Sequence, residues 1–214
     1  MTLELDVAQR TRTTAAIIEA LQGACPDSIC ELRGSLAAGT ADAYSDIDLR
    51  WTVGDADFHG ACRKVGQMLE GIGEVASLRA DRDSATHPTY RLMFARLTAL
   101  PLFWRIDLEI ISRDHDPEAI QPQRKPGSWS ATNSALMCAV AAIKAFLRRD
   151  PEAGAHLVSK GFERIHIPVP AVSPRRQVLV LAETIYDADD AYAPLAAQVR
   201  QLYREAFGGH EFDG

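Results

Sequence analysis

Two aspartates one residue apart, Asp46 and Asp48, follow the pair Gly34-Ser35 by about ten residues. Apolar residues alternate with them, which is typical of a strand, and side chains two residues apart on a strand point to the same side. Carboxylates this close repel each other and lose hydration in a cleft, and a bound divalent cation removes both problems. The pattern therefore predicts a magnesium site on one face of a strand.

A second apolar segment, Phe103 to Ser112, contains two acids on one face, Asp107 and Glu109. A carboxylate inside so apolar a strand is costly unless it is paired or binds a metal. If this strand lies beside the first, Asp107 completes a triad of acids such as two-metal phosphoryl transfer requires. An aspartate pair alone, on a solvated strand face, would be weak evidence, and the third acid strengthens the prediction.

The Gly34-Ser35 pair is expected to join a short strand, 28–33, to a short helix at 36–39. Free backbone N–H groups at the start of a helix favour phosphate. Gly34 would let a phosphate approach the backbone, and Ser35 can donate its hydroxyl. A phosphate-binding turn and a metal-binding strand would then lie about ten residues apart.

The elements that must position these residues form a front half with both helices and strands. Helical spacing, with apolar Ala15, Ile18 and Leu21, predicts a first helix over 7–22. Alternation and turn residues predict the other front elements: strands 28–33, 43–53 (with residue 44 as the alternative start), 75–78, 90–97 and 102–112, and a helix over 56–72.

The back half is expected to be helical. Three prolines and a glycine mark 114–129 as a linker between domains 1–113 and 130–214. Four helices are expected beyond it, over 130–149, 152–163, 173–190 and 194–207. The predicted fold class is α+β: a mixed β-sheet with helices, followed by an α-helical bundle.

Composition narrows the choice of partners. The 214 residues are 47% hydrophobic and 24% charged, with a formal net charge of −6, which argues against a nucleic-acid backbone and suits a cationic small molecule better. No run of about 18 apolar residues predicts a membrane span. The first residues lack a signal-peptide pattern and four cysteines are scattered, so we expect a cytoplasmic protein with reduced thiols.

These motifs resemble the nucleotidyltransferase superfamily typified by DNA polymerase beta. The resemblance rests on three stretches: Gly34-Ser35 with Gly39, Ser45-Asp46-Ile47-Asp48-Leu49, and Arg105-Ile106-Asp107-Leu108. The helical back half is similar in layout to the small-molecule branch, such as the aminoglycoside nucleotidyltransferases. A mixed sheet followed by helices is the fold that the resemblance implies.

The resemblance also implies roles for individual residues. Asp46 and Asp48 would ligate two magnesium ions, and Asp107 would ligate the catalytic one. Gly34 and Ser35 would hold the triphosphate of a nucleoside triphosphate, with ATP expected, and Ser45 is a further candidate for nucleotide binding. The implied reaction transfers a nucleoside monophosphate to a hydroxyl of a small molecule, for which an aminoglycoside-like cation is one candidate.

Three features leave choices open. Small members of the superfamily often carry an arginine between the Gly-Ser pair and the next glycine, whereas this chain has Leu36-Ala37-Ala38, so another Lys or Arg would have to substitute. Lys144, in an apolar helix, could reach the triphosphate or extend to the surface. Glu109 could act as a general base, bind a cationic substrate, or be a solvated edge carboxylate.

Other functions compete with transfer to a small molecule. One is a protein-modifying or antitoxin-type member of the superfamily, and another is an inactive descendant that binds nucleotide or a partner. A nucleic-acid polymerase is the least favoured, because the chain is short and acidic. The apolar C-terminal helices could close the cleft or bury a homodimer face.

Overall fold

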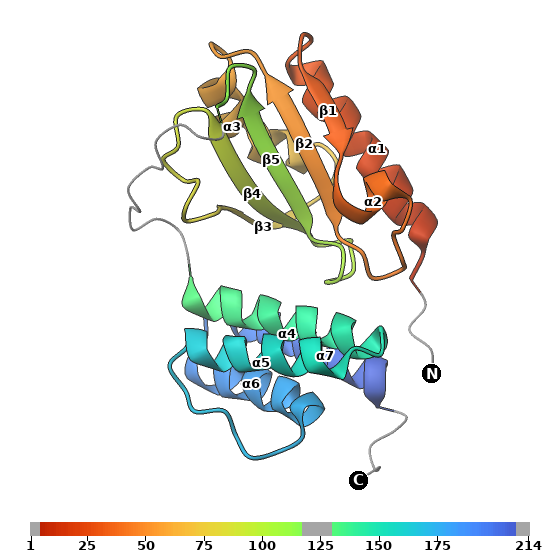
Figure 1. Cartoon of the computed structure of the whole chain (residues 1–214), viewed down its shortest axis with the longest axis vertical. Coiled ribbons are helices and arrows are strands. Elements are labelled where there is room, and N and C mark those ends of the chain that lie inside the picture. Colours follow the sequence, from red (N-terminus) through yellow and green to blue (C-terminus); the bar gives the residue numbers. More distant parts are fainter. Residues whose placement is uncertain (1–4, 117–129, 209–214) are drawn as a thin grey trace. The chain divides into compact units, whose positions relative to one another are not determined.

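The computed structural model describes residues 5–116 and 130–208. They fall into two compact units, one within 5–129 and the other within 130–214, and each is described by itself (Figure 1). From residue 117 onward, the predicted linker 114–129 lies outside the described residues.

The first unit is built on a five-stranded sheet with the strand order β1-β2-β5-β4-β3 (Figure 1). β2 and β5 are parallel and every other pair is antiparallel, so the predicted mixed sheet is confirmed. The strands are β1 (Ile29–Leu32), β2 (Ile47–Val53), β3 (Val75–Ala80), β4 (Tyr90–Leu97) and β5 (Ile106–Ser112).

Two helices, α1 (Val7–Ala24) and α3 (Phe58–Glu70), pack against each other and against the sheet. The central strands β2 and β5 alternate strictly between buried and half-buried residues. Arg91 of β4 lies over the Phe58 ring of α3, at 6.0 Å, which identifies the helix-covered face as the one opposite to Asp48 and Asp107. We call that opposite side the acid face.

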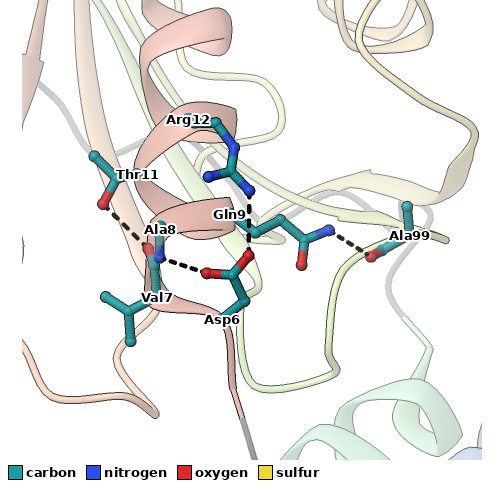
Figure 2. Close-up of polar contacts among 7 residues, drawn as sticks. All are labelled: Asp6, Val7, Ala8, Gln9, Thr11, Arg12 and Ala99. Carbon is teal, nitrogen blue, oxygen red and sulfur yellow. Dashed lines mark hydrogen bonds and ion pairs between the residues drawn. The ribbon is translucent and has the colours of Figure 1, made fainter.

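Helix α1 is fixed at its first turn (Figure 2). The Asp6 carboxylate accepts a hydrogen bond from the Ala8 backbone N–H at 3.0 Å and pairs with Arg12 at 3.2 Å. Gln9 donates to the carbonyl of Ala99 at 3.2 Å. Since Ala99 lies in the connection between β4 and β5, this bond joins the start of α1 to the segment that leads into β5.

The second unit has four helices around an apolar core: α4 (Ala131–Leu147), α5 (Pro151–Arg164), α6 (Pro174–Ala188) and α7 (Ala193–Phe207). Helix α4 contacts the other three and is buried on nearly all sides, as expected for a helix that is apolar all round. Ser130 and Asp150 cap α4 and α5 by accepting backbone N–H groups.

Two strands start later than predicted, for a common reason. β2 starts at Ile47 instead of residue 43 or 44, and β5 at Ile106 instead of residue 102. Before β5, the Trp104 N–H donates to the carbonyl of Pro101 at 2.9 Å and closes a turn. Before β2, the carbonyls of Asp42 and Ala43 accept side-chain donors, so this backbone does not extend the sheet.

No helix of the described residues is both long enough and apolar enough to cross a membrane. The four cysteines are free thiols, of which Cys30 and Cys138 are buried.

Candidate functional site

Two of the three predicted metal-binding acids are direct neighbours across the parallel strands. Asp48 of β2 is the register partner of Asp107 of β5, so both point to the acid face, with their backbones about 4.8 Å apart. Ile47 and Ile106, the preceding partners, are fully buried. The buried alternate positions fix the register, and a slip by one residue would turn both acids into the core.

Arg105 is the cation that balances these acids. Its Nε and Nη2 donate to the two carboxylate oxygens of Asp107, each at 2.5 Å. Burial by itself would lower the pKa of Arg105. The hydrogen bond and charge of Asp107, with the charges of Asp46 and Asp48, outweigh burial and raise that pKa. The charges of all three acids therefore favour the charged form of Arg105.

Asp46 precedes β2, in a loop whose backbone carbonyls accept hydrogen bonds from Arg10 and Trp104. Arg10 of α1, which is 3% exposed, donates from Nη1 to the carbonyls of Asp42 at 2.7 Å and Ser45 at 2.9 Å. Trp104 donates from Nε1 to the carbonyl of Ala43 at 2.8 Å. The pKa of Arg10 is lowered, because the effect of burial is larger than the opposing effect of the Asp42 and Asp46 charges.

Ser45, a predicted nucleotide-binding residue, has its hydroxyl inside this loop. The hydroxyl accepts from the backbone N–H of Asp42 at 3.0 Å and donates to the Asp42 carboxylate at 2.9 Å. The side chain is buried. Its observed contacts shape the loop that precedes Asp46, and its role in nucleotide binding stays a prediction.

Gly34 lies against Asp48. It has a φ of +54°, a conformation that side chains disfavour, and a Cβ placed on it would overlap the Asp48 carboxylate. The Arg33 N–H donates to the Asp48 carbonyl at 2.8 Å. The Gly-Ser turn and strand β2 are therefore in contact, and a side chain at position 34 would meet both the Asp48 carboxylate and an unfavourable φ.

The other predicted residues are described by their own elements. Ser35 is half-buried in α2 (Gly34–Ala38), a helix of five residues. Lys144 is 7% exposed on α4 and so does not extend to the surface, and it belongs to the helical unit. Glu109 accepts Arg50 Nε and Nη2 on one oxygen, each at 2.8 Å, and is therefore committed to a cross-strand ion pair. Its catalytic role stays a prediction.

The acids have the donor chemistry of a magnesium site. Among residues 5–116 and 130–208, no three or more His, Cys, Asp or Glu side chains are arranged to hold a metal ion. At the acid face, both oxygens of Asp107 contact Arg105. Carboxylate oxygens are the ligands that magnesium prefers, and the field that raises the pKa of Arg105 favours any cation. The donor chemistry of these acids fits magnesium, and Arg105 is the cation that occupies Asp107 in this structure.

The sequence patterns did not predict a role in this site for three residues: Arg10, Trp104 and Arg105. Arg105 stands two residues before Asp107, so the same alternation that placed Asp107 also placed Arg105 on its side. Arg10 lies in line with the buried residues Thr14, Ile17 and Leu21 of α1, and a cation in a buried stripe is a usable signal.

No family model matches the sequence, and no curated protein matches it. Similar solved structures include the GLD-2/RNP-8 complex, 14% identical with a TM-score of 0.38 over 85% of this chain and 55% of that one. The polymerase core of TRAMP, an RNA surveillance complex, is 15% identical with a TM-score of 0.38 over 97% of this chain and 59% of that one.

An aminoglycoside 6-adenyltransferase from Bacillus subtilis is 10% identical, with a TM-score of 0.25 over 79% of this chain and 82% of that one. The chain thus spans 55% and 59% of the length of the first two similar structures. At these values the likeness assigns no activity and no branch of a family, so the small-molecule branch stays a prediction.

Proposed function

We propose that this chain is a magnesium-dependent nucleotidyltransferase, which transfers a nucleoside monophosphate from a nucleoside triphosphate to a hydroxyl and releases pyrophosphate. The supporting observation is the pairing of Asp48 with Asp107 on adjacent parallel strands, with Asp46 close enough that all three acids raise the pKa of Arg105. Acids from segments about 60 residues apart in the chain converge on one face, as a two-metal site requires.

In this mechanism, Asp46 and Asp48 would hold two magnesium ions, and Asp107 would contribute to the catalytic one. Bound there, the ions would activate the attacking hydroxyl and neutralise charge on the phosphates. Arg105 would release Asp107, and in the structure its guanidinium already lies beside Phe94, 4.5 Å from the ring centroid. The chain's own contribution is to position the reactants and to balance charge.

The nucleotide is proposed to be ATP, with its triphosphate near Gly34 and Ser35. Support comes from the contact between Gly34 and Asp48, because a phosphate at this turn would lie beside the first metal-binding strand. Lys144 remains the candidate cation from the helical unit.

The acceptor is proposed to be a small molecule that carries a hydroxyl. The net charge of −6 disfavours a polyanion as the main partner, and an aminoglycoside-like cation is the candidate that the sequence resemblance offers. Glu109 would contact such a cation only by exchanging Arg50 for it.

Pyrophosphate release tests the proposed function. Wild type is incubated with ATP, a panel of hydroxyl-bearing acceptors, and magnesium or EDTA. We expect release that requires both magnesium and an acceptor, and that falls at least about 100-fold in Asp48→Asn and Asp107→Asn. Asp57→Asn, at an exposed aspartate before α3, is the matched control and should keep wild-type activity. Release that survives Asp107→Asn would contradict the proposal.

A further inference from the structure

One row of side chains crosses the acid face. The strand registers pair Arg79 of β3 with Phe94 of β4, Phe94 with Asp107 of β5, and Asp107 with Asp48 of β2. Paired residues on neighbouring strands point to the same side of a sheet, so all four lie on the acid face. With strands about 4.8 Å apart, the row spans roughly 14 Å.

Positive charge gathers at one end of this row. The guanidinium carbons of Arg79 and Arg105 each lie 4.5 Å from the centroid of the Phe94 ring. Cation–π contacts of this kind hold a guanidinium group in a defined place. Arg96, two residues beyond Phe94 on β4, belongs to the same face and donates to Ser77 Oγ at 3.1 Å. The row therefore changes from negative over β2 and β5 to positive over β4 and β3.

This polarity complements a ligand in which a divalent cation lies next to a phosphate. We propose, building on the function proposed above, that Arg79 and Arg105, stacked on Phe94, form a subsite for a phosphate group beside the acids. A guanidinium group suits that ligand, because its planar fork of donors can bind two phosphate oxygens at once. The subsite also supplies positive charge that the segment Leu36-Ala37-Ala38 lacks.

Arg105 contacts both the acidic and the basic part of the row, because it binds Asp107 and lies over the Phe94 ring. While it is bound to Asp107, its donors Nε and Nη2 are engaged by that carboxylate. A cation that takes its place at Asp107 leaves those donors available to a phosphate. Cation and phosphate should therefore bind more tightly together than separately, since each favours the arrangement that the other needs.

The net charge of −6 does not oppose a local anion site. At physiological ionic strength, exposed charges separated by more than about 8 Å are largely screened from each other. A phosphate in contact with Arg79 and Arg105 would sense these two cations far more strongly than the acids elsewhere on the surface. Arg79 and Arg105 therefore determine that this subsite prefers an anion, whatever the net charge of the chain.

The phosphate could belong to the nucleotide or to the acceptor. In-line displacement puts the attacking and leaving oxygens on opposite sides of the transferred phosphorus. If pyrophosphate leaves on the side of Gly34, the acceptor lies over β5 and β4 and its own phosphate would meet Arg79. If the triphosphate itself extends over β4, the nucleotide occupies the subsite.

Calorimetric titration with inorganic tripolyphosphate, without metal, tests the subsite. We expect Arg79→Gln to bind about tenfold more weakly than wild type, or worse, because a charge-assisted hydrogen bond is lost. Arg63→Gln removes the same charge from an exposed position on α3, on the covered side of the sheet, and should bind like wild type. Arg79→Lys keeps the charge without the fork, so binding between wild type and Arg79→Gln is expected. If Arg79→Gln does not fold, the comparison of Arg79→Lys with wild type takes its place.

Two further probes distinguish the sources of the phosphate. ATP with magnesium should lose affinity in Arg79→Gln if the nucleotide occupies the subsite, and ribose 5-phosphate should lose affinity if the acceptor does. Equal affinity of wild type and Arg79→Gln for all three anions overturns the subsite, as does a wild type that binds none of them. A wild type that binds ATP without any requirement for magnesium would overturn the proposed function instead.

Discussion

Arg105 and Asp107 form a two-point ion pair, in which Nε and Nη2 of the arginine each lie 2.5 Å from a different carboxylate oxygen of the aspartate. The side chains are 23% and 19% exposed, so water screens the pair only in part. Arg105 engages both oxygens of Asp107 and therefore competes with a metal ion for that carboxylate. The chain thus contains its own counter-ion for the acid cluster, and we predict that cation binding displaces it.

Replacing Arg105 should change metal affinity and stability in opposite directions. Arg105→Gln removes the competing cation, so Mn²⁺ should bind several-fold more tightly. Without metal, the repulsion among Asp46, Asp48 and Asp107 is no longer balanced, and the free energy of unfolding should fall by about 2 kcal/mol. Calorimetry measures the first quantity and urea unfolding the second. In Arg105→Lys, which retains the charge, both effects should be smaller, and an unchanged Mn²⁺ affinity in Arg105→Gln would contradict the exchange.

Gly34 should be required for metal binding as well as for the backbone turn. Gly34→Ala places a methyl group against the Asp48 carboxylate and strains a residue at positive φ. Gly39→Ala is the matched control, because its φ is +68° but nothing lies within 4 Å of the added Cβ. Both variants should lose about 1–2 kcal/mol of stability. Only Gly34→Ala should also lose stabilisation by magnesium, measured as a shift in Tm, and equal shifts in the two variants would refute this.

Arg10 should control the loop that carries Asp46. Arg10→Gln removes the donors to the Asp42 and Ser45 carbonyls and leaves buried acceptors without partners, which should cost about 2–3 kcal/mol in unfolding free energy. Hydrogen exchange of amides in the loop should accelerate more than exchange in β5. Trp104→Phe, which removes one donor, should cost about 1 kcal/mol. Uniform acceleration over the whole unit would show that Arg10 only stabilises the fold.

Acid should destabilise the α/β unit through His87. This side chain is buried, and burial, with the charges of His115 and Arg91, lowers its pKa below the ordinary value. Its Nδ1 accepts the backbone N–H of Thr89 at 3.2 Å, so the neutral ring is the one that fits.

The unfolded chain therefore binds this proton more readily, and the stability due to neutral His87 is complete above pH about 6.5 and decreases as the pH falls. His87→Gln should flatten the change in unfolding free energy between pH 7.5 and 5. His59→Gln, at an exposed histidine of α3, should keep the wild-type slope. Identical slopes in all three proteins would contradict the role of His87.

Local patterns were sufficient to predict most elements and to place Asp48 and Asp107 on facing positions if their strands were neighbours. The alternation around Ile47 and Trp51 predicted that one face of β2 is buried in the core and that Asp48 lies on the other face. The same pattern in β5 predicted that Asp107 lies opposite to its buried face. Strand adjacency was a condition of the prediction, and the register of β2 with β5 now shows that it is met.

Hydrophobic periodicity could not predict the contacts between segments that are distant in the sequence. The stripe predicted for the first helix included Ala15, which is exposed, whereas the buried stripe runs through Arg10 and Ile17. Arg10 can be buried in this stripe because backbone carbonyls of a loop more than 30 residues away accept its hydrogen bonds. The same long-range bonds keep the preceding residues out of the sheet, so that β2 starts at Ile47, three or four residues later than alternation predicted.

Mn²⁺ binding followed by electron paramagnetic resonance, with a non-hydrolysable ATP analogue present, tests the three-acid site most directly. We predict two bound ions per wild-type chain, and weakened binding of at least one of them in each of Asp46→Asn, Asp48→Asn and Asp107→Asn, with Asp57→Asn unchanged. Two ions bound with wild-type affinity in Asp48→Asn and Asp107→Asn would contradict the metal site and the transfer chemistry that depends on it.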